Sequence, residues 1–272
     1  MEIWNPWHGC RKISEGCENC YMYYLDSKRD RSGSDIYKVK SSFDLPLKRD
    51  RSGNYKVKSG TVLHVCLTSD FFLEEADEWR EDAWKMIKER DDVSFVILTK
   101  RAGRIETCLP DDWGKGYRNV KLRVTAENQK RADERIPVLL SVPSLHKGVM
   151  TAPLLGEIHI EKYLETGQIE YVIADGENYE GARPCRYEWV RSLYDQCREY
   201  GVEFEFAGTG NVFVKDGKTY NVCKAYQRVQ AIRSGLFWPP HENCDATVMR
   251  KCARCKMKDS CNGCRRCGKC TY

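Results

Sequence analysis

The sequence contains no long apolar run. None of its hydrophobic stretches approaches the roughly 18 consecutive apolar residues of a membrane-spanning helix, so we expect a soluble protein with no membrane partner. Met1-Glu2-Ile3-Trp4 has neither the basic residues nor the apolar core of a secretion signal, which leads us to expect a cytoplasmic location. A strong excess of one charge is also missing, because 45 Lys and Arg residues stand against 40 Asp and Glu residues. The net charge of +5 leaves nucleic-acid binding possible without favouring it.

Cysteine, by contrast, is abundant, with 15 residues in a chain of 272. In a reducing cytoplasm so many thiols indicate metal binding rather than disulfides. Cys10, Cys17 and Cys20 form a C-x6-C-x2-C array that supplies three thiolates and no fourth. An iron of a 4Fe-4S cluster that lacks a protein thiolate is open to a substrate or to S-adenosylmethionine, so the array predicts a catalytic cluster. The alternatives are a zinc site completed by His8, or a disulfide pair with a spare thiol.

The segments around these cysteines resemble a known family. The likeness covers about residues 3–210 and includes the following motifs: Trp4-Asn5-Pro6-x-x-Gly9-Cys10, Gly16-Cys17-x-x-Cys20-Tyr21, Thr68-Ser69-Asp70-Phe71-Phe72, Leu98-Thr99-Lys100-Arg101, Val124-Thr125-Ala126-Glu127-Asn128, Arg131 to Pro137, Pro153-Leu154-Leu155-Gly156, Gly176-Glu177 and Ala182-Arg183-Pro184. In order and content they resemble the three-Cys-motif family named after phage gene products, a divergent branch of the radical SAM enzymes. The resemblance implies a partial barrel, a 4Fe-4S cluster, S-adenosylmethionine, and an external electron donor such as flavodoxin or ferredoxin.

The resemblance also implies a specific activity. The size of the chain and its second group of cysteines suit a queuine lyase, which cleaves queuine to 7-aminomethyl-7-deazaguanine in queuosine salvage. Two departures from the family pattern, Ala152 and the segment 204–207, suggest a substrate different from that of the generic phage members. A radical SAM enzyme that repairs nucleic acid or modifies tRNA is the first alternative. A zinc-binding, non-catalytic nucleic-acid module is the second.

The second group of cysteines lies at the end of the sequence. Its members are Cys244, Cys252, Cys255, Cys261, Cys264, Cys267 and Cys270. Their repeated C-x2-C steps resemble ferredoxin ligation and predict one auxiliary 4Fe-4S cluster held by a subset of them, with a four-cysteine zinc module as the alternative. Four of the other thiols, Cys66, Cys108, Cys185 and Cys197, fall in apolar or amphipathic stretches, where we interpret them as small buried hydrophobic residues.

Short β-rich apolar runs alternate with amphipathic stretches along the chain. Strands are expected at 62–67, 94–98, 120–124, 171–174 and 202–206, and helices at 74–90, 129–140 and 187–200. This alternation predicts an α/β fold with a parallel sheet. Because only about six strands can be counted and the radical SAM resemblance implies this form, we expect a partial (βα)6-type radical SAM barrel. It is predicted to span 1–210, followed by a connecting segment at 211–240 and a small Cys-rich iron-sulfur extension at 241–272.

A duplication interrupts this barrel. The sequences RDRSG and YKVKS occur at 29–33 and 37–41 and again at 49–53 and 55–59. Each copy predicts a turn followed by a short strand, so we expect a hairpin-like insert or lid at 28–60. Its basic residues are interpreted as a solvated face, with RNA contact as the alternative.

Polar residues follow several of the expected strands, at the edge where parallel sheets carry their sites. S-adenosylmethionine needs acidic or carbonyl acceptors, a cation and hydroxyl groups. The expected cofactor-binding residues are Tyr21, Tyr23, Ser69, Asp70, Lys100 and Glu127. For a small-molecule nucleobase such as a deazaguanine, the expected binding residues are Asp175, Glu177, Arg183 and Glu205. The alternative interpretation of the Ser, Thr, Asp and Asn residues among these strand ends is helix N-capping.

Overall fold

The computed structural model describes residues 2–238, and its central feature is one sheet in the order β1-β4-β5-β6-β7-β8-β10-β13. These strands are β1 (Glu2–Trp4), β4 (Val62–Val65), β5 (Ser94–Thr99), β6 (Val120–Thr125), β7 (His146–Thr151), β8 (Ile169–Asp175), β10 (Glu203–Gly208) and β13 (Phe237–Trp238). All neighbours are parallel except β13, which runs antiparallel to β10. The expected α/β class with a mostly parallel sheet is confirmed. Within residues 2–238 the sheet ends at β1 and β13, and no closed barrel is formed.

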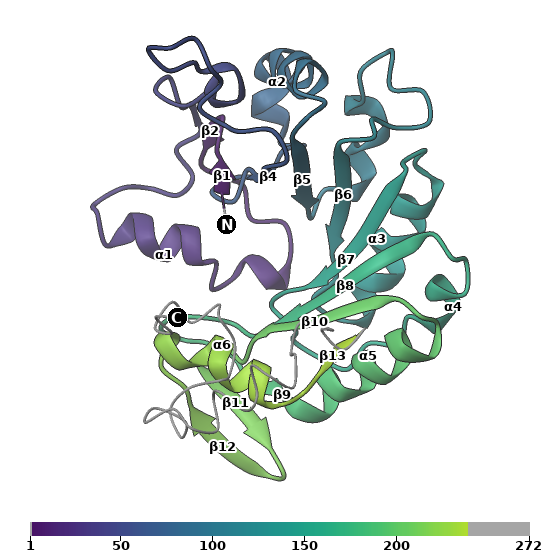
Figure 1. Cartoon of the computed structure of the whole chain (residues 1–272). Helices are drawn as coiled ribbons and strands as arrows, with labels where there is room; N and C mark the ends of the chain where they lie inside the picture. The colour runs from purple at the N-terminus through teal and green to yellow at the C-terminus, as the bar shows by residue number, and fades with distance from the viewer. Residues whose placement is uncertain (1, 239–272) are drawn as a thin grey trace.

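The two faces of this sheet differ. Helices α2 (Asp77–Glu89), α3 (Gln129–Ser141), α4 (Glu161–Leu164) and α5 (Tyr187–Glu199) pack on the outer face, as Figure 1 shows. Outward side chains such as Phe95, Val124 and Phe204 join the helices in one buried core. Alternate residues such as Leu98 and Met150 are partly exposed on the opposite face, here called the inner face. Because successive side chains of a strand point to opposite faces, this pattern leaves the inner face open to a ligand.

The expected strands and helices are present, with shifted ends. The expected strand at 62–67 ends at Val65 because Cys66 has a left-handed φ of 57° and its carbonyl accepts a hydrogen bond from the Ser69 amide in a turn. The expected helix at 74–90 begins as the 3-10 turn η3 (Glu74–Ala76) and continues as α2. Strand β7 lies where the sequence predicted none.

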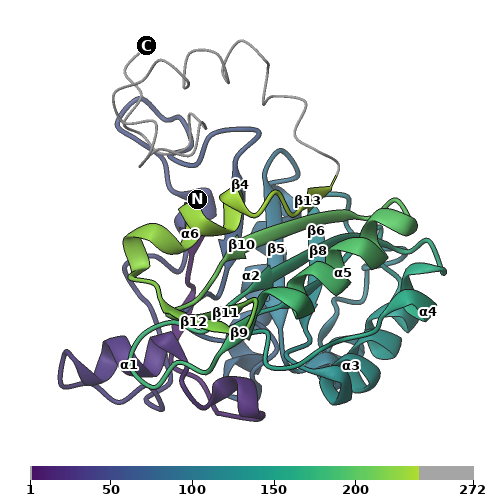
Figure 2. The same ribbon diagram turned by 90° about the horizontal axis from the view of Figure 1, so that it is seen from below.

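Smaller elements surround the inner face. Helix α1 (Tyr21–Ser27) stands at its open side, away from α3 and α4 in both Figure 1 and Figure 2. The segment expected as a connection contains β11 (Val212–Lys215), β12 (Lys218–Asn221), α6 (Lys224–Arg233) and β13, and β9 (Cys185–Arg186) pairs with β11. Short 3-10 turns occur at η1 (Glu15–Cys17), η2 (Leu45–Leu47), η4 (Ala102–Arg104) and η5 (Glu106–Cys108). The seven cysteines expected to hold an auxiliary cluster, Cys244 to Cys270, lie outside the described residues.

The two copies of the duplicated segment take different environments. In the first copy, β3 (Tyr37–Lys38) pairs antiparallel with β2 (Trp7–His8), just before the first cysteine. In the second, Arg49 and Tyr55 form an isolated antiparallel bridge around a turn. The copies therefore do not form one hairpin with each other. Among the described helices, none has the length and apolar composition needed to cross a membrane.

Candidate functional site

Cys10, Cys17 and Cys20 lie on one loop between β2 and α1, which we call the cysteine loop (residues 9–20). All three are free and partly exposed. The hydroxyl of Tyr23, on the first turn of α1, donates a hydrogen bond to the carbonyl oxygen of Cys10. Burial raises the pKa of Tyr23, and negative charge on Cys10, Cys20 and Cys17 raises it further. The charges of the three cysteines thus all act on one hydroxyl group.

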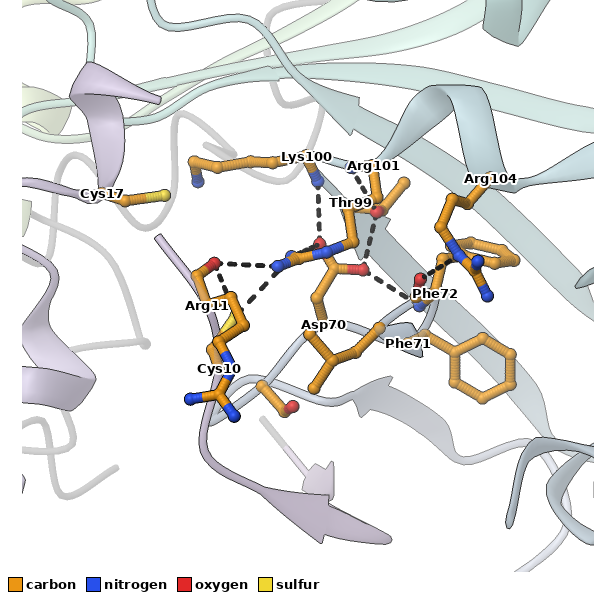
Figure 3. Close-up of polar contacts among 12 residues, drawn as sticks. Cys10, Arg11, Cys17, Asp70, Phe71, Phe72, Thr99, Lys100, Arg101 and Arg104 are labelled. Carbon is orange, nitrogen blue, oxygen red and sulfur yellow. Dashed lines mark hydrogen bonds and ion pairs between the residues drawn. The ribbon is translucent and has the colours of Figure 1, made fainter. Parts of the chain in front are cut away.

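The first anchor of the cysteine loop comes from the ends of β4 and β5. The Asp70 carboxylate is buried and accepts hydrogen bonds from Thr99 Oγ1 at 2.7 Å and from the Lys100 amide at 3.1 Å. It also accepts one from Arg101 Nη1 at 3.2 Å (Figure 3). Held in this way, Arg101 Nη1 lies 3.6 Å from the Cys10 sulfur.

Arg101 changes the electrostatics of Cys10. Burial raises the pKa of the Cys10 thiol to about 11, and the positive charge of Arg101 acts against that rise. The same guanidinium donates to the carbonyl oxygen of Arg11 at 2.8 Å. Arg101 thus fixes the backbone next to Cys10 and places a cation beside its sulfur, which favours the thiolate needed for metal binding.

The second anchor comes from the end of β6. Glu127 is 0% exposed; Ser14 Oγ and Arg135 Nη1 donate to its carboxylate, the latter at 2.8 Å. A Cβ on Gly16 would lie 2.6 Å from Glu127 Oε1, so only glycine fits at this point of the cysteine loop. The neighbouring Glu15 accepts hydrogen bonds from Arg131 on α3, which lower its pKa to about 2.

The third anchor comes from the end of β8. Arg183 donates to both carboxylate oxygens of Glu177, at 2.9 and 2.6 Å, and to the carbonyl oxygen of Glu15 at 2.8 Å. Asn19 Nδ2 donates to Glu177 at 3.0 Å. Burial acts to raise the pKa of Glu177, but hydrogen bonds from Arg183 and Asn19 outweigh it and lower the pKa. Two of the four residues expected to bind substrate, Glu177 and Arg183, are thus joined to each other and to the cysteine loop.

The other residues expected to bind the cofactor are Ser69, Tyr21 and Lys100, and only the first two use their side chains in hydrogen bonds within the described part of the fold. Ser69 Oγ donates to the carbonyl oxygen of Gly9 at 2.5 Å, and the Tyr21 hydroxyl donates to that of Leu67. The Lys100 side chain extends toward the side of Cys17 in Figure 3. Within residues 2–238 its ammonium group has no hydrogen bond or ion pair. Lys100 is therefore a cation available to a ligand beside the cysteines.

Asp175 ends β8 with one carboxylate oxygen, Oδ1, buried and without a hydrogen-bond partner. Burial raises its pKa to about 7, a rise that Lys224 and Arg228 reduce and Glu205 increases. At neutral pH this carboxyl group therefore holds its proton about half the time and can then donate a hydrogen bond as well as accept one. Glu205, on the neighbouring strand β10, pairs with Ile173, two residues before Asp175. The Tyr171 hydroxyl donates a hydrogen bond to Glu205, and Arg228 forms an ion pair with it.

The zinc alternative requires His8 to join the three cysteines at one metal ion. Within residues 2–238 no group of three His, Cys, Asp or Glu side chains is placed to hold a single metal ion. His8, the candidate fourth zinc ligand, instead has its Nε2 2.7 Å from the Asp26 carboxylate.

Several anchoring residues were not assigned from the sequence. Arg101 follows Lys100 directly, so its position after a strand was a usable signal. Ser14, Asn19, Arg131 and Arg135 meet their partners only through the tertiary fold, and nothing in their local sequence marks those contacts.

The site can be set beside known proteins. None of the curated protein sequences matches the chain. A solved structure of a spore photoproduct lyase mutant with bound AdoMet and dinucleoside spore photoproduct aligns with 73% of this chain and 51% of its own, at 14% sequence identity and a TM-score of 0.42. The chain thus spans about half the length of that lyase, and a likeness of this degree does not establish a shared activity. A family model described as a protein of unknown function, DUF5131, matches residues 1–238, which include the cysteine loop and the whole described sheet. The chain therefore belongs to the DUF5131 family.

Proposed function

We propose that this protein is a radical SAM enzyme in which Cys10, Cys17 and Cys20 hold a 4Fe-4S cluster. The observation that carries the proposal is a loop that holds three cysteines and is anchored at the carboxyl edge of a parallel sheet, through Arg101, Glu127 and Glu177. The donor set fits the group, because a cluster takes each thiolate on a different iron, whereas zinc requires its ligands to converge on one point. When bound, the cluster and S-adenosylmethionine supply a 5′-deoxyadenosyl radical that abstracts hydrogen from a substrate.

The residues around the loop have separate tasks in this proposal. Three carboxylates hold the cysteine loop: those of Asp70, Glu127 and Glu177. Each forms an ion pair with an arginine, and either the carboxylate or that arginine contacts the loop. Arg101 offsets the negative charge of the thiolates. Lys100, whose ammonium group is free within residues 2–238, suits the carboxylate of S-adenosylmethionine. Tyr21 and Ser69 fix the adjoining backbone through their hydrogen bonds to carbonyl oxygens.

For the substrate, we infer a 7-deazaguanine base and, as the specific activity, that of a queuine lyase. The buried carboxyl of Asp175 supports a base, since a protonated carboxyl pairs with an amide edge by donating one hydrogen bond and accepting another. Glu205 is a second acceptor on the same face. In this reaction the bond between the amine and the cyclopentenediol is cleaved, and 7-aminomethyl-7-deazaguanine is released.

The proposal is tested by anaerobic reconstitution with iron and sulfide, followed by S-adenosylmethionine, dithionite and queuine. Iron content and mass spectrometry of the products are measured. The triple variant Cys10→Ser/Cys17→Ser/Cys20→Ser is compared with Cys108→Ser, a control at a partly exposed thiol outside the loop. We expect 5′-deoxyadenosine and 7-aminomethyl-7-deazaguanine from the parent protein and the control, and neither from the triple variant.

The two parts of the proposal fail separately. 5′-Deoxyadenosine without the deazaguanine product keeps the radical enzyme and removes queuine as its substrate. A cluster-loaded parent protein that forms neither product overturns both parts. Equal iron content in the parent and the triple variant overturns the assignment of the three ligands.

A further inference from the structure

Arg123 lies on the inner face of the sheet, in a row that crosses three strands. The strand register pairs Arg123 on β6 with Gly148 on β7, and Gly148 with Tyr171 on β8. The guanidinium carbon of Arg123 lies 4.6 Å from the centre of the Tyr171 ring. Arg123 therefore reaches across β7 and stacks on an aromatic ring two strands away, which fixes the plane of its guanidinium group.

Gly148 makes this arrangement possible. A Cβ at this position would meet the Tyr171 carbonyl oxygen at 2.9 Å and the side chain of Arg123 at 3.3 Å. The bare backbone of β7 thus leaves the space in which the arginine side chain lies. Within residues 2–238, no hydrogen bond or ion pair engages the guanidinium group, although it has five N–H donors.

Arg123 faces a cavity of about 330 Å³ that Glu170, Glu203 and Glu205 also line. Glu170, on its wall, lies 3.0 Å from His146, and Glu205 is held by Tyr171 and Arg228. Glu203 is exposed at its rim. Lys121 and His64 line the same cavity, and neither has a hydrogen bond or ion pair within the described residues. The cavity therefore presents two cations, Arg123 and Lys121, whose donors are free.

We propose that this cavity binds the oxyanion group of a small ligand, a phosphate or a carboxylate, through Arg123 and Lys121. The stacked guanidinium offers two parallel N–H donors, the geometry that such groups accept, and Lys121 adds a second charge. Apolar side chains of Val96 and Ile173 line the cavity and receive the rest of the ligand. None of the three cysteines lines this cavity, which shares Glu205 with the proposed substrate-binding residues.

The test is a titration of the full-length protein with inorganic phosphate, and in a second arm with succinate, by calorimetry at constant ionic strength. We expect saturable binding that weakens at least about tenfold in Arg123→Gln, because the charge-assisted pair is lost. Arg123→Lys keeps the charge without the fork and should fall between the two. Glu203→Gln removes a negative charge at the rim and should tighten binding. Arg118→Gln, an exposed arginine outside the cavity, is the matched control and should leave binding unchanged.

Two results would overturn the proposal. One is equal anion affinity in Arg123→Gln and Arg118→Gln, with native circular dichroism spectra for both variants. The other is that neither phosphate nor succinate binds saturably. Preference for phosphate or for succinate identifies which oxyanion the site takes. Because no cluster is needed for binding, this test is independent of the proposed radical chemistry.

Discussion

At the scale of single residues, Asp175 couples burial to proton binding. Its folded pKa of about 7 lies above the ordinary value of 3.8, because burial penalises the charged form. Between these two pH values the folded protein keeps a proton that the unfolded chain releases. Stability therefore falls as pH rises through this window, by roughly 4 kcal/mol at most, since each pH unit contributes about 1.4 kcal/mol.

Asp175→Asn should remove this pH dependence. The variant is expected to match the parent protein near pH 4 and to exceed its unfolding free energy at pH 8, because an amide does not ionise. Urea unfolding across this pH range measures the effect, and Asp91→Asn, at an exposed position, controls for the loss of a carboxylate. Parallel pH profiles for Asp175→Asn and the parent protein would show that the carboxyl group is not buried as described.

Gly16 lies where the cysteine loop packs closely against the side chain of Glu127. Glu127 is held from two sides by Ser14 and Arg135, so an added methyl group at Gly16 must displace a hydrogen-bonded carboxylate. Gly16→Ala should therefore destabilise the protein by about 1–3 kcal/mol and lower the iron bound on reconstitution. Gly103→Ala, where a Cβ meets nothing within 4 Å, is the control for both measurements. If both variants bind iron like the parent protein, the Glu127 anchor does not position the cysteine loop.

At the scale of elements, the helix-covered face was easier to predict than the inner face. Strand β5 reads SFVILT, and its continuous apolar run marks a buried strand. Strand β7 reads HKGVMT, because its inner face carries His146 and Gly148 beside the cavity, and no apolar pattern remains to identify it. Where the sheet faces a cavity rather than a core, the composition that makes a strand recognisable is absent.

Some features of the candidate site could likewise be predicted from the sequence, and others could not. The spacing of the three cysteines and the polar residues after the strands predicted where a site would form, because parallel strands end at one edge. The ion pair of Glu127 with Arg135 and the fork of Arg183 on Glu177 were not predictable, since each depends on how a loop and a helix meet. The sequence therefore predicts a site at this edge of the sheet, but not the partners that its side chains engage within the fold.

Arg90 fixes the second copy of the duplicated segment to the end of α2. It is 1% exposed and donates to the carbonyl oxygens of Pro46 and Val57 and to Asp92. Arg90→Lys should lower the unfolding free energy by about 2–4 kcal/mol, because lysine lacks the fork and leaves buried acceptors unpaired. Urea denaturation measures this, with the exposed Arg51→Lys as the control. A loss no larger than that of the control would mean that this segment is not latched by Arg90.

At the scale of the whole molecule, the distribution of charge bears on the size of the substrate. A protein that acts on RNA or DNA neutralises several phosphates, and its affinity then falls steeply with salt. Here 45 basic and 40 acidic residues nearly balance, and many of the described arginines are paired with carboxylates within the fold. Such a surface suits a small substrate that enters the inner face more than a polymer that lies across it.

We therefore expect no RNA binding tighter than the non-specific range of about 10⁻⁴–10⁻⁶ M at physiological salt. Fluorescence anisotropy with a single-stranded RNA, measured over a series of salt concentrations, tests this. Arg29→Gln/Arg31→Gln/Arg51→Gln removes three exposed cations of the duplicated segment and should leave the titration unchanged, since a solvated face makes no phosphate contacts. Submicromolar binding with a steep salt dependence that this variant abolishes would make the duplicated segment a nucleic-acid contact. The substrate proposed for the enzyme would then be a base within a nucleic acid rather than a free base.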